Sequence, residues 1–334
     1  MGPDSKLGNY RLVRKIASGG MGTVYLAQRE DWTRDFSKYF AIKVMHPHLA
    51  SEASFVRMFL DEARVAIQIE HQRVCSVIEV GVSNGVHFLV MEYLNGKTLG
   101  RIAKDTQSNG PSPESAPYFY ETYQHYVARM VADAAEGLHA AHETRGPDGK
   151  LLELVHRDVS PHNIMVTYAG AVKVVDFGIA RARERLEKTE SGMVKGKLRY
   201  ASPEQLGGRT LDRRTDIWSL GVCLWETVTL RSPFPQEDQA ELVAAITSRP
   251  LPDPRAYAPW LHPELERIML RALAKSPGER FETARDMSTA LRAFLFSAGT
   301  MVEANEISEW MQADEPASAA GAPPLPPPGA AVEL

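Results

Sequence analysis

The stretch His156-Arg157-Asp158-Val159-Ser160-Pro161-His162-Asn163 sets two oxygen-bearing side chains, Asp158 and Asn163, five positions apart. The valine-rich segment Val172-Lys173-Val174-Val175 follows shortly and leads into Asp176. Phosphoryl transfer needs little covalent help from a protein, but it needs metal ligands near the phosphates and an acceptor that orients the attacking hydroxyl. Asp158, Asn163 and Asp176 are groups of these kinds. The alternative, polar turns beside two buried strands, would have to produce all three residues at these spacings by chance.

Two weaker motifs lie closer to the N-terminus. Ile16-Ala17-Ser18-Gly19-Gly20-Met21-Gly22-Thr23-Val24 is a glycine-rich turn. Missing side chains let backbone N–H groups approach phosphate oxygens, although a tight hairpin turn would need no ligand. Further on, Lys43 lies in an apolar strand, and Glu62 lies on the apolar stripe of a predicted helix. Because a buried carboxylate needs a cationic partner, we expect Glu62 to pair with Lys43.

Periodicity predicts an α+β chain whose two halves differ. Short β-branched and aromatic runs predict five strands of a small antiparallel sheet, interrupted by one helix over 52–70; the strands are 10–16, 23–27, 40–45, 77–80 and 87–91. The second half predicts helices over 126–142, 216–230, 237–248, 264–274 and 284–298. Polar, Gly- and Pro-containing segments at 106–117 and 145–150 predict surface loops.

These motifs, in this order, resemble those of the protein kinase superfamily over roughly residues 8–296. Downstream markers agree: Ser202-Pro203-Glu204 resembles the Ala-Pro-Glu motif, Asp216 opens the most apolar helix, and Arg280 stands where the family pairs an arginine with that glutamate. The sequence of the glycine-rich turn is similar to that of bacterial eukaryotic-like Ser/Thr kinases. The resemblance implies an N-terminal extension (1–9), a kinase domain (10–296, with a small lobe over about 10–92 and a helical lobe over about 95–296) and a tail (297–334).

The resemblance also implies the roles of the site residues. Asp158 is the expected catalytic base, Lys43 holds phosphates and pairs with Glu62, and Asn163 and Asp176 bind Mg²⁺. The expected ATP contacts are Ile16, Ser18, Gly19, Gly20, Gly22, Val24, Ala41, Lys43, Met91, Glu92, Leu94 and Met165. For the apolar members, plain core packing is the competing interpretation. Arg157 is expected to bind a phosphate on the activation segment, with Thr189 and Ser191 as candidate sites.

Three positions depart from the family pattern. Ala17 replaces the first loop glycine. If the turn needs a positive φ at this position, the replacement would cost about 1 kcal/mol of conformational free energy. Ser160 stands where Ser/Thr kinases carry a lysine that contacts the transferred phosphate, and Lys197 stands where they carry a threonine. We therefore hypothesise a swap in which the Lys197 ammonium fills the space beside Asp158. The alternative is a pseudokinase scaffold in which Lys197 is a solvated surface residue.

Composition narrows the remaining choices. A net charge of −4 on 334 residues, with both signs interspersed, argues against nucleic acid as a partner. Two cysteines in apolar surroundings, Cys75 and Cys223, fit a reducing, cytoplasmic compartment. No apolar run reaches the length of a membrane span, and the Ala/Pro-rich stretch from about Ala313 predicts disorder. We expect a kinase that uses ATP and Mg²⁺ on Ser/Thr hydroxyls of proteins, with autophosphorylation; self-association and a longer parent chain stay open.

Overall fold

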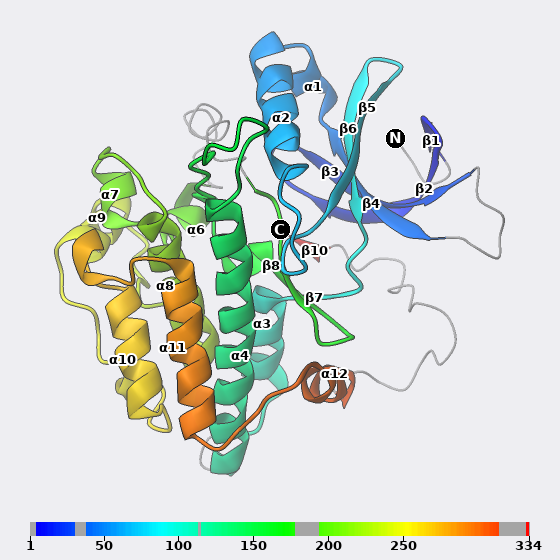
Figure 1. Ribbon diagram of the computed structural model, residues 1–334. Helices are drawn as coiled ribbons and strands as arrows, with labels where there is room; N and C mark the ends of the chain where they lie inside the picture. Colours follow the sequence, from blue (N-terminus) through cyan, green and yellow to red (C-terminus); the bar gives the residue numbers. More distant parts are fainter. Residues whose placement is uncertain (1–4, 31–37, 113–114, 178–193, 314–331, 334) are drawn as a thin grey trace. The chain divides into compact units, whose positions relative to one another are not determined.

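The computed structural model describes residues 5–30, 38–112, 115–177, 194–313 and 332–333 (Figure 1). They fall into two compact units. Unit 1 takes the described residues among 1–70, 75–95 and 315–334, and unit 2 takes those among 71–74 and 96–314.

Unit 1 is built on one sheet. Its five main strands are the predicted ones, with somewhat longer bounds: β2 (Tyr10–Ser18), β3 (Gly22–Arg29), β4 (Tyr39–Met45), β5 (Val77–Ser83) and β6 (Val86–Glu92). Among the described residues the sheet has seven strands, in the order β1-β2-β3-β4-β6-β5, with β10 (Val332–Glu333) paired in parallel with β2 and the other neighbours antiparallel. The predicted count of five is therefore too low. The two extra strands, β1 (Lys6–Leu7) and β10, have two residues each, which is too short to show alternation in a sequence.

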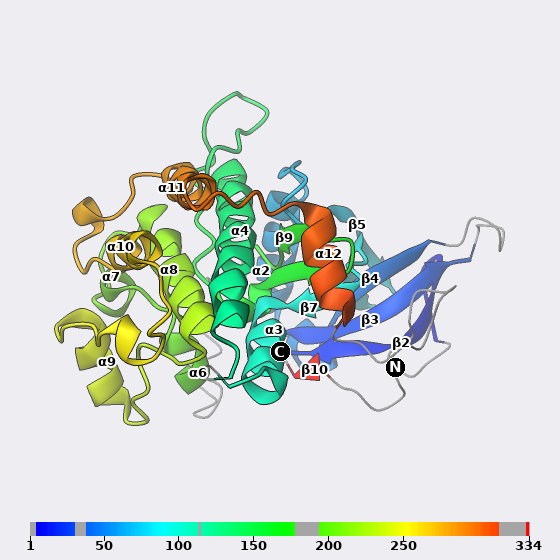
Figure 2. The same cartoon turned by 90° about the horizontal axis from the view of Figure 1, so that it is seen from below.

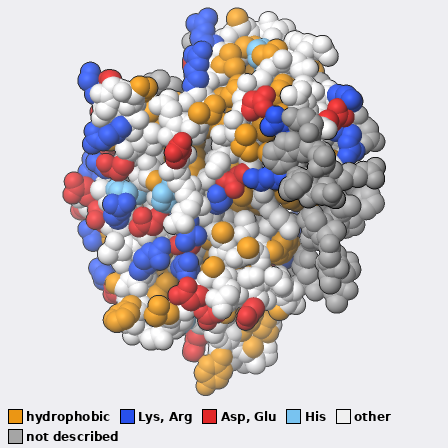
Figure 3. Space-filling view, turned by 45° about the vertical axis from the view of Figure 1, so that its right-hand side comes forward, with side chains coloured by type: hydrophobic (Ala, Val, Ile, Leu, Met, Phe, Trp, Pro, Cys, Tyr) orange, Lys and Arg blue, Asp and Glu red, His pale blue; other side chains and the backbone are white. Residues whose placement is uncertain are grey.

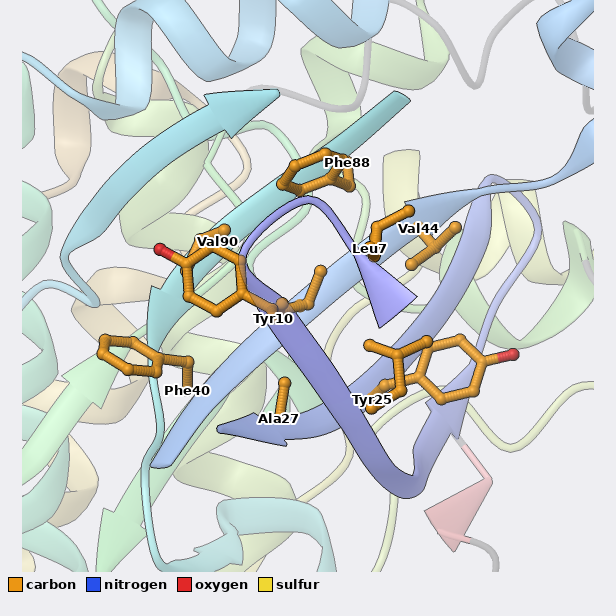
Figure 4. Packing of buried hydrophobic residues seen from close by; sticks show 10 residues of the cluster. Leu7, Tyr10, Tyr25, Ala27, Phe40, Val44, Phe88 and Val90 are labelled. Carbon is orange, nitrogen blue, oxygen red and sulfur yellow. The ribbon is translucent and has the colours of Figure 1, made fainter. Parts of the chain in front are cut away.

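A hydrophobic cluster covers one face of this sheet (Figure 4). Its members alternate along the strands with residues of the opposite face, as the two-residue period of a strand requires; they are Leu7, Tyr10, Leu12, Tyr25, Ala27, Phe40, Ile42, Val44, Phe88 and Val90. Tyr10 also meets Phe40 edge to face, with ring centroids 5.6 Å apart. The cluster leaves the other face of β3 and β4 to the residues expected at the nucleotide.

Two helices complete the described part of unit 1: α1 (Pro47–Ala50) and α2 (Ala53–Ala66). Of the predicted inward residues, Phe55, Phe59 and Ala66 are buried on α2. The prediction of a helix over 52–70 runs too far, because the chain tightens after Ala66 into bonds of the i→i−3 type, from Gln68 N to Val65 O and from Ile69 N to Ala66 O. The side chain of Glu62 lies outside the described residues.

Unit 2 is mainly helical. Its helices are α3 (Leu99–Asn109), α4 (Pro117–His142), α6 (Val194–Leu198), α7 (Pro203–Leu206), α8 (Arg214–Thr229), α9 (Gln239–Thr247), α10 (Pro263–Ala272), α11 (Ala284–Ser297) and α12 (Ala304–Ala313), with short 3₁₀ turns η2 (Pro161–Asn163), η3 (Pro254–Ala256) and η4 (Pro277–Glu279). The apolar helix α8 forms the centre, and its Trp218 and Trp225 are 0% exposed.

The predicted loop over 106–117 is partly wrong. Helix α3 continues to Asn109, and α4 begins at Pro117 instead of the predicted residue 126. Proline suits the first turn of a helix, where its missing N–H has no partner to lose. Inside α3, the polar residues Gln107 and Ser108 are exposed and so do not break the helix.

A three-stranded sheet in unit 2 carries the decisive stretch of sequence. Its strands are β7 (Gly96–Thr98), β8 (Ile164–Thr167) and β9 (Val172–Val174), all antiparallel. The turn η2 with Asn163 comes directly before β8, and Asp176 follows two residues after β9. The hairpin β8–β9 therefore connects the two predicted metal ligands.

The segment predicted as a tail from residue 297 contains a further helix, α12, which packs within unit 2. Its Ile307 and Met311 are 0% and 2% exposed. Ten residues with two apolar anchors give too weak a pattern to stand out beside the Ala/Pro-rich stretch that follows. Residues 314–331 lie outside the described residues, so the prediction of disorder there stays a prediction.

The surface carries both signs of charge. Over the face in Figure 3, acidic and basic side chains are interspersed, in keeping with the net charge of −4. In the described part of the chain, no helix is both long and apolar enough to cross a membrane.

Candidate active site

A buried carboxylate fixes the backbone of the catalytic stretch. Asp216, at the start of α8, is 0% exposed and accepts hydrogen bonds from the backbone N–H groups of His156 and Arg157, both at 2.8 Å. His142 Nε2 lies 2.7 Å from the same carboxylate. Burial alone would raise the pKa of Asp216, but the hydrogen bonds from His142 and the backbone outweigh it and hold the pKa below its usual value. Asp216 therefore stays ionised as the anchor of the stretch.

The backbone is strained at two functional positions. Arg157 has φ 66° and Asp176 has φ 57°, in the left-handed region that non-glycine residues rarely adopt. Such conformations persist only where the surroundings impose them. At Arg157 these include the bond to Asp216 and a hydrogen bond of 3.0 Å from Gln205 Nε2 to its carbonyl.

Asp158 and Asn163 are joined directly. The Asn163 amide donates to the backbone carbonyl of Asp158 at 2.8 Å and lies 3.4 Å from its Oδ2. The carbonyl of Asn163 accepts from Val175 N at 3.0 Å, which connects it to the end of β9 next to Asp176. Because the amide nitrogen is engaged, the oxygen Oδ1 is the atom through which Asn163 would bind a metal.

The donors fit Mg²⁺, which prefers oxygen ligands and keeps several waters and substrate phosphates in its shell. Asp176 supplies a carboxylate and Asn163 an amide oxygen. Among the described residues, no group of three or more His, Cys, Asp or Glu forms a metal site. One Asp and one Asn, completed by phosphate and water, would not produce such a group.

Lys197 reaches the carboxylate of Asp158, the predicted catalytic base. Its Nζ lies 3.1 Å from Asp158 Oδ2, and the two side chains are 32% and 14% exposed. Ser160, where the family carries a lysine, is buried and carries no charge. The contact is the placement that the swap hypothesis requires; the catalytic role itself remains to be tested.

His162 adjoins this pair electrostatically. Desolvation lowers the pKa of His162, and the Lys197 ammonium lowers it further, whereas Asp158 opposes both. Sequence reasoning did not single out His162, because a lone histidine in a loop has no distinguishing local pattern. The pKa of His162 is useful as a reporter of the charge on Lys197.

The residues expected at the nucleotide are divided between the two units. Met165 belongs to unit 2 and the others to unit 1. Within unit 1, register places Val24 opposite Lys43 and Ala41 opposite Met91, so all four lie on the sheet face that the hydrophobic cluster does not cover. Lys43 is only 6% exposed. Its pairing with Glu62 stays a prediction, because the side chain of Glu62 is outside the described residues.

The glycine-rich turn is braced from β4. A Cβ on Gly22 would come within 2.3 Å of the Val44 carbonyl oxygen, so only glycine fits there, whereas Gly19 and Gly20 have open space around them. His46 Nε2 lies 2.8 Å from the Gly19 carbonyl oxygen, a support that sequence reasoning missed. The expected penalty at Ala17 does not arise, because Ala17 lies inside strand β2 and its φ is not positive.

The pairing of Glu204 with Arg280 is confirmed. Two parallel hydrogen bonds of 2.7 and 2.8 Å join their side chains, which are nearly excluded from solvent. Thr215 adds a third bond, of 2.9 Å, to the carboxylate. The ion pair attaches α7, at the end of the activation segment, to the helical unit. Thr189 and Ser191 lie outside the described residues, so the expected phosphate on that segment and its contact with Arg157 remain predictions.

Comparisons with known proteins agree with the kinase resemblance of the sequence. Residues 10–290 match the family model described as the protein kinase domain. The chain is 42% identical over 291 residues to the tyrosine-protein kinase MasK of Myxococcus xanthus, covering 86% of this chain and 43% of that protein. It is 33% identical over 286 residues to the serine/threonine-protein kinase PrkC of Bacillus subtilis, covering 85% and 40%. The chain thus spans about two fifths of the length of these curated relatives.

A solved structure has the same fold. The kinase domain of PknI from Mycobacterium tuberculosis is 25% identical and aligns with a TM-score of 0.63, covering 90% of this chain and 100% of that one.

Proposed function

Since this chain belongs to the protein kinase family, we propose that it transfers the γ-phosphoryl group of ATP to a hydroxyl of a protein substrate. The observation that carries the proposal is the arrangement around Asp158. Its carboxylate is 14% exposed, its backbone is bound by Asn163, and its loop is anchored on Asp216. This is a fixed carboxylate beside one metal-binding oxygen donor, with a second donor at Asp176.

We propose the following division of roles. Asp158 orients the substrate hydroxyl and takes its proton as the new O–P bond forms and the bond to the ADP oxygen breaks. Asn163 and Asp176 hold Mg²⁺, which would neutralise charge on the phosphates, and Lys43 binds the α- and β-phosphates. The glycine-rich turn has room for a phosphate around Gly20, whose backbone N–H would point to it, whereas the N–H of Gly19 donates to the Gly22 carbonyl at 2.9 Å and closes the turn.

Lys197 is proposed to replace the lysine that is missing at Ser160. Its ammonium is 3.1 Å from Asp158 Oδ2, and 32% of the side chain remains exposed, so it can turn from the carboxylate to a phosphoryl oxygen as negative charge develops there. Positioned cations of this kind stabilise the transition state more than the ground state.

A further question is which amino-acid hydroxyl accepts the phosphoryl group. We propose Ser and Thr, in line with PrkC, and keep tyrosine as a second candidate because the relative MasK is named a tyrosine kinase. The residues that usually mark Ser/Thr specificity are both changed here, to Ser160 and Lys197. Phosphoamino-acid analysis of the autophosphorylated chain decides between the candidates: phosphoserine or phosphothreonine supports our choice, and phosphotyrosine alone reverses it.

We further propose that the chain acts in the cytosol, with residues 10–296 as its kinase domain. Both cysteines, Cys75 and Cys223, are buried thiols outside any disulfide, as is usual in a reducing compartment. Self-association for autophosphorylation is testable by mixing an active chain with an Asp158→Asn chain and looking for phosphate on the latter.

The central experiment compares wild type with Asp158→Asn in labelled ATP and Mg²⁺. Transfer by wild type, and a loss of about 10²-fold or more in the variant, are expected for a base of this kind. Asp148→Asn, on an exposed turn, is the matched control and should keep full activity. ATP binding by wild type without any turnover would instead support the pseudokinase alternative.

A further inference from the structure

The segment after α11 is held by unit 2 instead of leaving it. Arg129, on α4, donates a hydrogen bond from Nη1 to the carbonyl of Val302, and Val302 itself is 4% exposed. The chain then forms α12, which lies near the lower part of α4 in Figure 1, where it is seen nearly end-on, and is seen lengthwise in Figure 2. We call residues 298–313 the C-terminal strap.

Aromatic rings join the strap to α4. The Trp310 ring centroid lies 5.9 Å from that of Tyr123 and 5.4 Å from that of Tyr126. Ile307 and Met311, on the same side of α12, are nearly fully buried. Burial of these side chains gives the strap a hydrophobic attachment that a plain linker would not need.

Helix α12 is also hydrogen-bonded to the turn between β8 and β9. Ser308 Oγ donates to the Tyr168 carbonyl at 2.6 Å, and Gln312 Nε2 donates to the same oxygen at 3.3 Å. Gly170, with φ +76°, lies so close to the strap that a Cβ there would be 1.8 Å from the Ala304 carbonyl oxygen. The backbones of the turn and the strap therefore pack too closely to leave room for a side chain at position 170.

A second route reaches the other end of the hairpin. Arg129, which holds Val302, also pairs with Asp133 at 3.2 Å, and Asp133 is 0% exposed. Asp133 pairs at 2.9 Å with Arg73, whose carbonyl accepts a hydrogen bond of 2.9 Å from Val174 N in β9. The strap is thus connected to the turn of the hairpin directly and to β9 through α4.

We propose that the C-terminal strap positions the β8–β9 hairpin and, through it, Asn163 and Asp176. Asn163 directly precedes β8 and Asp176 follows β9, and the two strands are paired from Ile164–Val174 to Val166–Val172. A shift of the turn moves both side chains together. The part that concerns metal rests on the proposed function of these two residues, and the functional kinase unit accordingly extends to Ala313 instead of ending near 296.

The test uses the full chain with Ser308→Ala and Trp310→Ala combined, which removes the shorter of the two bonds to Tyr168 and the ring contacts of Trp310. Ser308→Ala alone is the milder variant should the pair fail to fold. Glu309→Ala, on the exposed side of the same helix, is the matched control. Two readouts are taken: amide hydrogen exchange of residues 164–174 without nucleotide, and the Mg²⁺ concentration that gives half-maximal phosphoryl transfer.

We expect exchange of residues 164–174 to accelerate by roughly 10-fold, and half-saturation to need several-fold more Mg²⁺, with the control unchanged. Faster exchange confined to α12, or no change in residues 164–174, overturns the proposal. Faster hairpin exchange with an unaltered Mg²⁺ requirement overturns the positioning of the metal ligands. If wild type transfers no phosphate, the proposed function fails, and the exchange measurement still decides whether the strap holds the hairpin.

Discussion

The ammonium of Lys197 lies 3.1 Å from Oδ2 of Asp158, a residue 39 positions earlier in the chain. Helix α6 brings Lys197 from the end of the activation segment, and the loop anchored on Asp216 presents Asp158. Position 160, where the family carries a lysine, holds a buried serine with no charge, so Lys197 is the proposed cation beside Asp158.

Replacement of Lys197 by Met should lower kcat by roughly 10²-fold, the effect of removing one positioned transition-state donor. ATP affinity should change less, because the lysine contacts Asp158, which is proposed to act on the substrate hydroxyl. Steady-state kinetics and ATP titration measure the two effects. Lys104→Met, an exposed lysine on α3, serves as the control; unchanged kcat in Lys197→Met would show that the lysine is a surface residue.

A reciprocal swap tests the compensation directly. Lys197→Thr alone should be as impaired as Lys197→Met, and Ser160→Lys added to it should recover much of the lost kcat. Ser160→Lys in an otherwise wild-type chain should impair transfer, because it sets two ammonium groups beside one carboxylate. Kinetics of the four chains form a double-mutant cycle, and additive losses with no recovery would count against the swap.

The pKa of His162 should report the same charges without catalysis. Desolvation and Lys197 lower it and Asp158 raises it, so Lys197→Met should raise the pKa and Asp158→Asn should lower it further. NMR titration of the His162 ring, assigned with His162→Gln, measures the shift. A His162 pKa that ignores both substitutions would mean that the ammonium is elsewhere in solution.

Breaking the Glu204–Arg280 pair should destabilise the protein strongly. Arg280→Met leaves a buried carboxylate without its cation, and we expect unfolding to require about 3 kcal/mol less. Denaturant unfolding gives the difference. Arg267→Met, which breaks an exposed pair with Glu264, should change stability by less than about 1 kcal/mol; similar losses in both variants would contradict the assigned burial.

Lys275 should make stability depend on alkaline pH. Desolvation, aided by Arg280, lowers its pKa to about 8, while its Nζ donates to the carbonyls of Ala245 and Ile246. The unfolded chain, with a pKa near its ordinary value, therefore binds more protons above pH 8, so the Lys275 contribution to stability rises with pH from about 8 toward 10.5.

The comparison with Lys275→Met isolates this effect, because other titrating groups cancel in the difference. The advantage of wild type over the variant should grow between pH 7.5 and 9.5 by on the order of 1 kcal/mol, less than the full shift because the ammonium is partly solvated. Denaturant unfolding at several pH values follows it. A constant difference over this range would mean that the lysine titrates normally.

Sequence reasoning found the main elements and the motif residues because both leave local signals. The two-residue period of β3 and β4 fixes which side chains share a face, and the spacing from Asp158 to Asn163 is short enough to be read directly. Elements with weak local patterns were missed. Strands β1 and β10 are two residues long, and α12 is anchored by few apolar side chains.

The sequence by itself determined which chemistry to expect of this protein: an acid, an amide and a second acid stand at spacings that are typical of phosphoryl transfer. It raised the exchange of Ser160 for Lys197 as a hypothesis, because it showed a lost charge and a gained one. Only the tertiary structure decided that Lys197 meets Asp158 and that the strap meets Gly170. Such contacts join residues far apart in the chain, and their distances depend on how whole helices pack, which no local pattern encodes.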